Sequence, residues 1–96
     1  MTNWHNKSTD DFCNALLSLK TKEELYDFLD DICTIKEMLD ISQRLSVAKM
    51  LKKGISYSAI SKETGASTAT ISRVNKCLVY GSSGYKTVLE RMGKES

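Results

Sequence analysis

Apolar side chains recur at the spacing of an α-helix along most of the chain. From about Thr9, three of them fall at positions i, i+4 and i+7, which predicts an amphipathic helix; they are Phe12, Leu16 and Leu19. Residues 1–7 lack this periodicity, so we expect a flexible tail there and a single domain over residues 8–96.

Capping residues indicate where the next two helices begin. Thr21 and Glu24 form the pattern T-x-x-E, which favours a helix start, and the helix that follows should bury Leu25, Phe28, Leu29 and Ile32. Thr34 and Glu37 repeat the pattern more weakly, because T-x-x-E also recurs by chance. A long helix should then reach about Lys53, with a buried stripe of Met38, Ile41, Leu45 and Ala48.

Glycines and serines divide the second half of the chain into shorter helices. Gly54 suits the left-handed residue after a helix, and Ser56 can cap a helix over residues 57–64. Gly65 breaks that helix, and either Ser67 or Thr68 can cap the next one.

We expect the fifth helix to end at about Leu78 and to be followed by a loop over residues 81–84. A last short helix should end at Gly93. No segment alternates apolar and polar residues as a strand would, so the sequence predicts an all-α chain of six helices. Val47 and Tyr26 lie outside the apolar stripes, and we expect them to face a second subunit.

The segment from about Tyr57 to Lys76 has the spacing of a helix-turn-helix. Two helices that cross closely need a small residue where they touch, and Ser61 supplies it. Four positions later Gly65 permits a positive φ without a Cβ clash. The buried contacts should come from Ile60, Ala66, Ile71 and Val74.

The opposite face of the second helix is then free to enter the major groove of double-stranded DNA. It carries Thr68, Ala69, Ser72 and Arg73, followed by Lys76. Short side chains let a helix sit deep, and Arg73 can bind either guanine or a phosphate. We also expect contacts with phosphates of the DNA backbone from Ser67, at the helix N-terminus, and from Lys49, Lys52 and Lys53.

The distribution of charge agrees with a polyanionic partner. Residues 1–40 hold four Lys and nine Asp or Glu, a net charge of −5, whereas residues 41–96 hold ten Lys or Arg and three Glu, a net charge of +7. The alternative is a helical protein–protein interaction module that does not bind DNA, in which Gly65 serves only as a helix cap.

Other classes of function have little support in the sequence. Cys13, Cys33 and Cys77 are widely spaced and form no CxxC pair, which favours reduced, partly buried thiols in a cytoplasmic protein over a metal or redox site. There is no signal peptide and no apolar run near 18 residues, so we expect no membrane association. No nucleophile has a base in view, and we expect neither an enzyme nor a cofactor.

From about Leu16 to Met92 the chain resembles the Trp repressor superfamily, in particular its YerC/YecD group. The most specific segment, residues 65–73, looks like the turn and recognition helix of the repressor, and residues 34–37, 42–45 and 51–54 fit its central helix in the same order. The resemblance implies six helices interlaced with a second copy, hence a homodimer that acts as a transcriptional regulator, most simply a repressor.

The resemblance also implies a possible small-molecule effector. In tryptophan-responsive members two arginines hold the amino acid between the central and recognition helices, and Arg44 and Arg73 match those positions. Thr34 matches a threonine near the amino group, whereas Cys77 replaces a serine and Val74 replaces a glycine beside the ring. A branched side chain would intrude on a flat indole, so we expect that tryptophan is not the effector, and Arg44 can equally be a structural or phosphate-facing residue.

Overall fold

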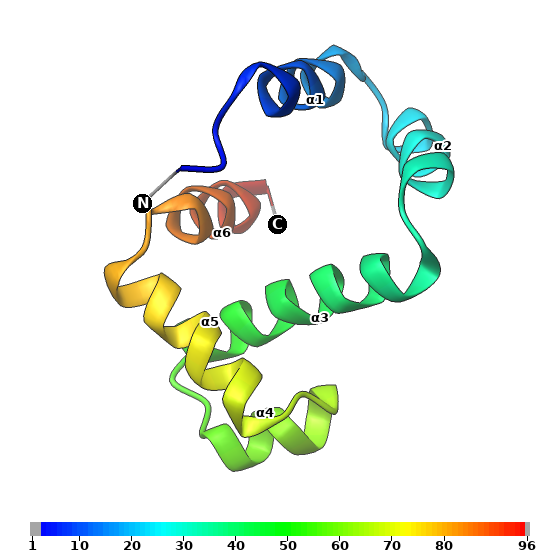
Figure 1. Ribbon diagram of the computed structural model, residues 1–96. Coiled ribbons are helices and arrows are strands. Elements are labelled where there is room, and N and C mark those ends of the chain that lie inside the picture. Colours follow the sequence, from blue (N-terminus) through cyan, green and yellow to red (C-terminus); the bar gives the residue numbers. More distant parts are fainter. Residues whose placement is uncertain (1–2, 96) are drawn as a thin grey trace. The chain divides into compact units, whose positions relative to one another are not determined.

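A computed structural model describes residues 3–95, with side chains up to Gly93, and this part of the chain forms six helices and no strand (Figure 1). The helices are α1 (Lys7–Ser18), α2 (Lys22–Ile32), α3 (Ile35–Lys52), α4 (Tyr57–Thr64), α5 (Thr68–Tyr80) and α6 (Gly84–Glu95). The predicted all-α class is therefore confirmed. None of the helices within residues 3–95 is both long and apolar enough to cross a membrane.

Both predicted T-x-x-E starts are helix caps in the structure. The Thr21 hydroxyl accepts a hydrogen bond from the Glu24 N–H at 3.1 Å, and the Glu24 carboxylate accepts one from the Lys20 N–H at 2.7 Å. At α3 the exchange is fully reciprocal, because Thr34 Oγ1 accepts from Glu37 N at 3.1 Å and Glu37 Oε1 accepts from Thr34 N at 2.8 Å. The weaker of the two sequence patterns thus forms the more complete capping box.

Several helix ends differ from the prediction. α1 begins at Lys7 rather than about Thr9, because Asn6 caps it: Asn6 Oδ1 accepts from Thr9 N at 3.0 Å, and Thr9 Oγ1 accepts from Asn6 N at 2.9 Å. α5 continues to Tyr80, two residues past the expected end. α6 continues through Gly93, which was wrongly expected to end it; one glycine near an exposed helix end lowers helix stability by only about 1 kcal/mol.

The chain divides into two compact units, residues 1–38 and residues 39–96. In the first unit, the rings of Phe12 and Phe28 lie 6.1 Å apart between α1 and α2. Neither helix fully buries a residue within the chain: the stripe residues Phe12, Leu25 and Ile32 are 38–50% exposed, and the other stripe residues are half-buried, namely Leu16, Leu19, Phe28 and Leu29. The apolar stripes of these two helices are therefore only partly covered in a single chain.

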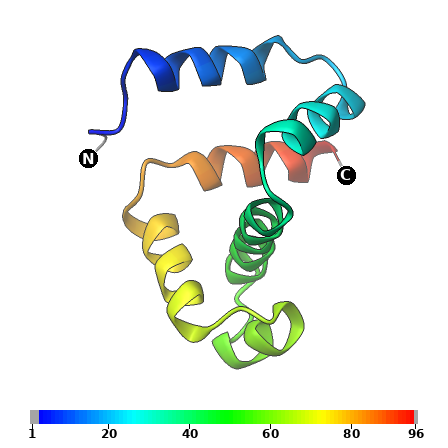
Figure 2. The ribbon, with the colours of Figure 1, turned by 45° about the vertical axis from the view of Figure 1, so that its right-hand side comes forward.

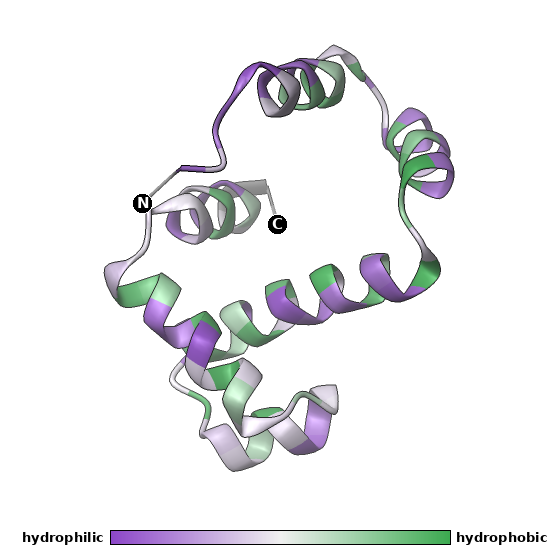
Figure 3. Cartoon of the chain, viewed as in Figure 1, coloured by the Kyte–Doolittle hydropathy of each residue, from purple (hydrophilic) through white to green (hydrophobic). Residues whose placement is uncertain are grey.

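The hydrophobic core lies in the second unit. Figures 1 and 2 show α4 and α5 grouped at the C-terminal end of α3, and Figure 3 shows apolar and polar residues on each of these helices. The buried residues come from α3, from α4 with its following turn, and from α5 and α6; they are Val47, Ala48, Ile60, Ala66, Ile71, Val74 and Leu89. The core thus forms where the last turns of α3 meet the helices that follow it.

Three expectations about burial need correction. Val47 was expected to face a second subunit but is fully buried in the core of its own chain, because other helices cover the end of α3 on more than one side. In the predicted stripe of α3 only Ala48 is buried, while Ile41 is 51% exposed. Of the cysteines, Cys33 is half-buried as expected, but Cys13 and Cys77 are exposed.

Glycine is required by the backbone at the connections around α4 and α5. Gly54 and Gly65 have φ values of 80° and 77°, as predicted for the left-handed residues that end α3 and α4. Gly81 ends α5 for a different reason, since a Cβ atom there would collide with the Cys77 carbonyl. The four-residue loop expected over residues 81–84 is one residue shorter, because α6 already begins at Gly84.

Candidate nucleic-acid interface

The predicted helix-turn-helix is present as α4, a turn over residues 65–67, and α5; these residues, 57–80, are called the reading head below. Its four expected contacts, Ile60, Ala66, Ile71 and Val74, are all buried, with exposed fractions of 0–2%. One face of α5 is consequently fixed against the core. The opposite face is exposed.

Hydrogen bonds inside the reading head define its turn. The Gly65 N–H donates to the Ser61 carbonyl at 2.8 Å, and the Ser61 hydroxyl donates to the Ala66 carbonyl at 2.8 Å. The Ala66 N–H donates to the Thr64 hydroxyl at 3.1 Å, and that hydroxyl donates to the Ile60 carbonyl at 2.8 Å. Ser61 was predicted only as a small residue at the crossing, but its side chain also fastens the turn.

Ser67, rather than Thr68, caps the recognition helix. Its Oγ accepts from Thr70 N at 3.1 Å and donates to Thr70 Oγ1 at 3.1 Å. The residues predicted to face the groove all lie on the exposed side of α5; they are Thr68, Ala69, Ser72, Arg73 and Lys76. The free N–H groups at this helix end and the cations nearby attract negative charge.

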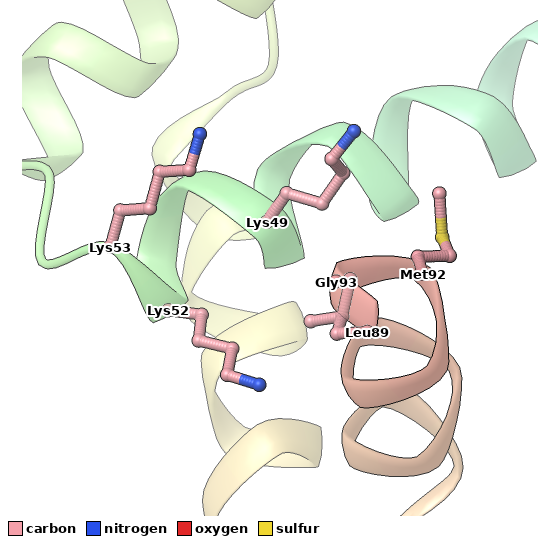
Figure 4. A pocket seen from close by; sticks show the side chains of 6 residues that line it. All are labelled: Lys49, Lys52, Lys53, Leu89, Met92 and Gly93. Carbon is pink, nitrogen blue, oxygen red and sulfur yellow. The ribbon is translucent and has the colours of Figure 1, made fainter. Parts of the chain in front are cut away.

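The three lysines near the end of α3 do not form one row. Figure 4 shows the side chains of Lys49 and Lys53 pointing to one side of α3 and that of Lys52 to the other. All three, with Leu89, Met92 and Gly93, line an open hollow of about 370 Å³. Lys49 and Lys53, unlike Lys52, also line a groove with Glu63 and Thr64 of the reading head and therefore lie beside the end of α4.

Arg44 and Cys77, two of the candidate effector-binding residues, both lie near the Tyr85 side chain. Burial raises the pKa of the Tyr85 hydroxyl, the Cys77 thiol raises it further, and the Arg44 guanidinium lowers it. Arg44 and Tyr85 line an open hollow of about 470 Å³ with Ile41, Leu45, Gly84 and Val88. Tyr85 of α6 is thus half-buried and lies near both Arg44 of α3 and Cys77 of α5.

The other candidate effector-binding residues have different surroundings. Arg73 is exposed on the recognition helix, one turn before Cys77. Thr34 belongs to the first unit, where its hydroxyl already caps α3. Val74 is 2% exposed and belongs to the core, as its branched side chain suggested.

Sequence reasoning missed one residue that contacts the reading head. The Gln43 side chain of α3 donates a hydrogen bond from Nε2 to the Thr64 carbonyl at 3.0 Å, and both residues are half-buried. Nothing in the local sequence indicates this contact, because the two residues are 21 positions apart. Gln43 also lines the groove that contains Lys49 and Lys53.

Comparisons with known proteins agree with this architecture. The family model described as Trp repressor protein matches residues 7–93. A relative from Bacillus subtilis, described as the uncharacterized protein YerC, is 54% identical over 86 residues, which are 90% of this chain and 83% of that protein.

Two solved structures have nearly the same fold. A TrpR-like protein from Eubacterium eligens superimposes with a TM-score of 0.92 at 49% identity, over 97% of this chain and 96% of the other. A candidate Trp repressor from Staphylococcus aureus also gives 0.92, at 45% identity, over 97% and 95% of the two chains.

Proposed function

Because the chain belongs to the Trp repressor family, we propose that it is a sequence-specific DNA-binding regulator of transcription that reads the major groove as a dimer. The family's fold is that of a regulator rather than an enzyme, and we assign the chain no catalytic role. Repression would follow from occupancy of an operator.

The observation that carries this proposal is the division of α5 into two faces. Ile71 and Val74 are buried against the core, while Thr68, Ser72 and Arg73 project from the other side. A helix that is rigidly held on one face and small and polar on the other suits insertion into a groove about 12 Å wide. Arg73 is the side chain on this face with the geometry to bind guanine bidentately.

Positive charge around this face supports a nucleic-acid partner. Lys76 follows Arg73 on α5, and Lys49 and Lys53 line the groove beside the end of α4. Residues 41–96 have a net charge of +7. Phosphate contacts would fix the register of the reading head, and contacts from α5 to base edges would supply the sequence specificity.

Exposed apolar surface supports the dimer. α1 and α2 bury no residue within the chain, although both carry apolar stripes. A chain of 96 residues has a small core, and covering these stripes with a second copy would add to its stability. Two-fold symmetry would also present two reading heads to DNA, about 34 Å apart.

Arg73→Ala should weaken binding to a selected operator by about 1–3 kcal/mol per half-site if Arg73 reads a base. If Arg73 contacts a phosphate instead, the slope of the logarithm of the binding constant against the logarithm of the salt concentration should become smaller in magnitude by about 0.9 per reading head, and by twice that in a dimer. Fluorescence anisotropy with operator and random duplexes over a salt series measures both quantities.

Lys62→Ala is the matched control, because it removes one positive charge from the exposed part of α4 without altering the proposed α5 face. It should change both affinities little. If Arg73→Ala binds the operator as tightly as the wild type, Arg73 does not lie on the reading face. If the wild-type chain has no affinity for any duplex at low salt, the protein-interaction module becomes the better interpretation.

The dimer is tested by sedimentation equilibrium at micromolar concentration. We expect a mass near twice that of the 10.8 kDa chain, with no dependence on DNA, because a second copy would cover the apolar stripes of α1 and α2 in the free protein. A single species of 10.8 kDa would contradict this assembly.

Titration calorimetry with millimolar tryptophan, with and without operator DNA, should show no saturable binding. Val74 is part of the core at the position where an indole would need a flat slot, and Cys77 lies near Tyr85 instead of offering a hydroxyl to an ammonium group. Binding that saturates and tightens in the presence of operator would show that the effector pocket has survived these replacements.

A further inference from the structure

We propose that Gln43 is a positioning residue that sets the angle of the reading head against α3, so that the head is aligned by the chain itself without a bound ligand. The proposal rests on the DNA-reading role assigned above. It begins from the bond that Gln43 Nε2 donates to the Thr64 carbonyl at 3.0 Å.

The Thr64 carbonyl is a specific target for such a bond. Thr64 is the last residue of α4, where carbonyl groups lack partners within the helix and carry the negative end of the helix dipole. Other polar groups of the turn form hydrogen bonds within the reading head itself; they belong to Ser61, Gly65 and Ala66. The Gln43 bond differs from these because its donor comes from outside the head.

The reading head is joined to the neighbouring helices by two short connections, each of which contains glycine. It joins α3 through residues 53–56, where Gly54 has a positive φ, and joins α6 through residues 81–83. The packing of Val47 against the core holds the head in place, but apolar contact has little directional preference. A hydrogen bond weakens steeply when its angle changes, so it selects one orientation.

The location of this bond connects it to recognition. Gln43 and Thr64 line the same groove as Lys49 and Lys53, the lysines proposed to contact phosphates beside the head. The bond therefore joins α3, which carries Lys49 and ends next to Lys53, to the reading head, which carries Arg73. Reading of base edges requires these two sets of side chains to keep a fixed spacing, whereas non-specific attraction to phosphates does not.

Gln43→Met tests the proposal, because methionine keeps the length of the side chain and removes the amide donor. We expect affinity for a selected operator to fall about two- to tenfold per head, while affinity for random duplex DNA stays within about twofold. The matched control is Ser46→Ala. Ser46 is a polar residue of the same groove that, among the described residues, caps no group of the reading head, so its replacement should leave both affinities unchanged.

Nuclear magnetic resonance provides a readout that does not involve DNA. Residual dipolar couplings of α3 and α5 should fit one alignment tensor in the wild type, and those of α5 should be reduced in Gln43→Met. The Gly65 amide, bonded to Ser61 within the head, should remain equally protected from exchange in both proteins.

The outcomes separate the two proposals. If the couplings of α5 fall but no duplex binds the wild type, Gln43 aligns the head and the DNA-binding function is wrong. If the couplings are unchanged, or if operator and random affinities fall equally, Gln43 has no positioning role. Loss of protection at Gly65 would also overturn the proposal, because it would show that Gln43 supports the fold of the turn rather than its angle.

Discussion

Three fully buried aliphatic side chains, Val47 of α3, Ile60 of α4 and Ile71 of α5, hold the reading head to the central helix. Removing each from water contributes about 1.5–3 kcal/mol, which is a large share of the stability expected for a domain of this size. Because these contacts bury one face of α5, they also determine which face remains exposed. The same packing that stabilises the second unit therefore determines which residues of α5 are exposed for the proposed contact with DNA.

Hydrogen bonds hold parts of the reading head that the apolar core does not bury. Ser61 closes the turn between the two helices of the head, and Gln43 joins that turn to α3. Tyr85 of α6 lies near Arg44 and Cys77. Ser61 thus holds the turn from within the head, and Gln43 holds it from α3.

The sequence predicts the reading head well because its determinants are local. The spacing of Ile60, Gly65 and Ile71 follows from one helix, one left-handed residue and a second helix, and each needs neighbours only a few residues away. Val47 and Gln43 could not be placed in this way. Val47 is buried because the end of α3 is covered on more than one side, and the partner of Gln43 lies 21 residues away, so both depend on how whole helices pack.

Selection of bound duplexes from a random DNA pool, followed by sequencing, tests the central claim most directly. The account predicts enrichment of a two-fold symmetric sequence whose half-sites are centred about one helical turn apart, because two reading heads would enter successive major grooves. Base preferences in each half-site should weaken when Arg73 is replaced by alanine. Recovery of unenriched sequence at low salt, or of no DNA at all, would contradict the assignment of this chain as a sequence-specific regulator.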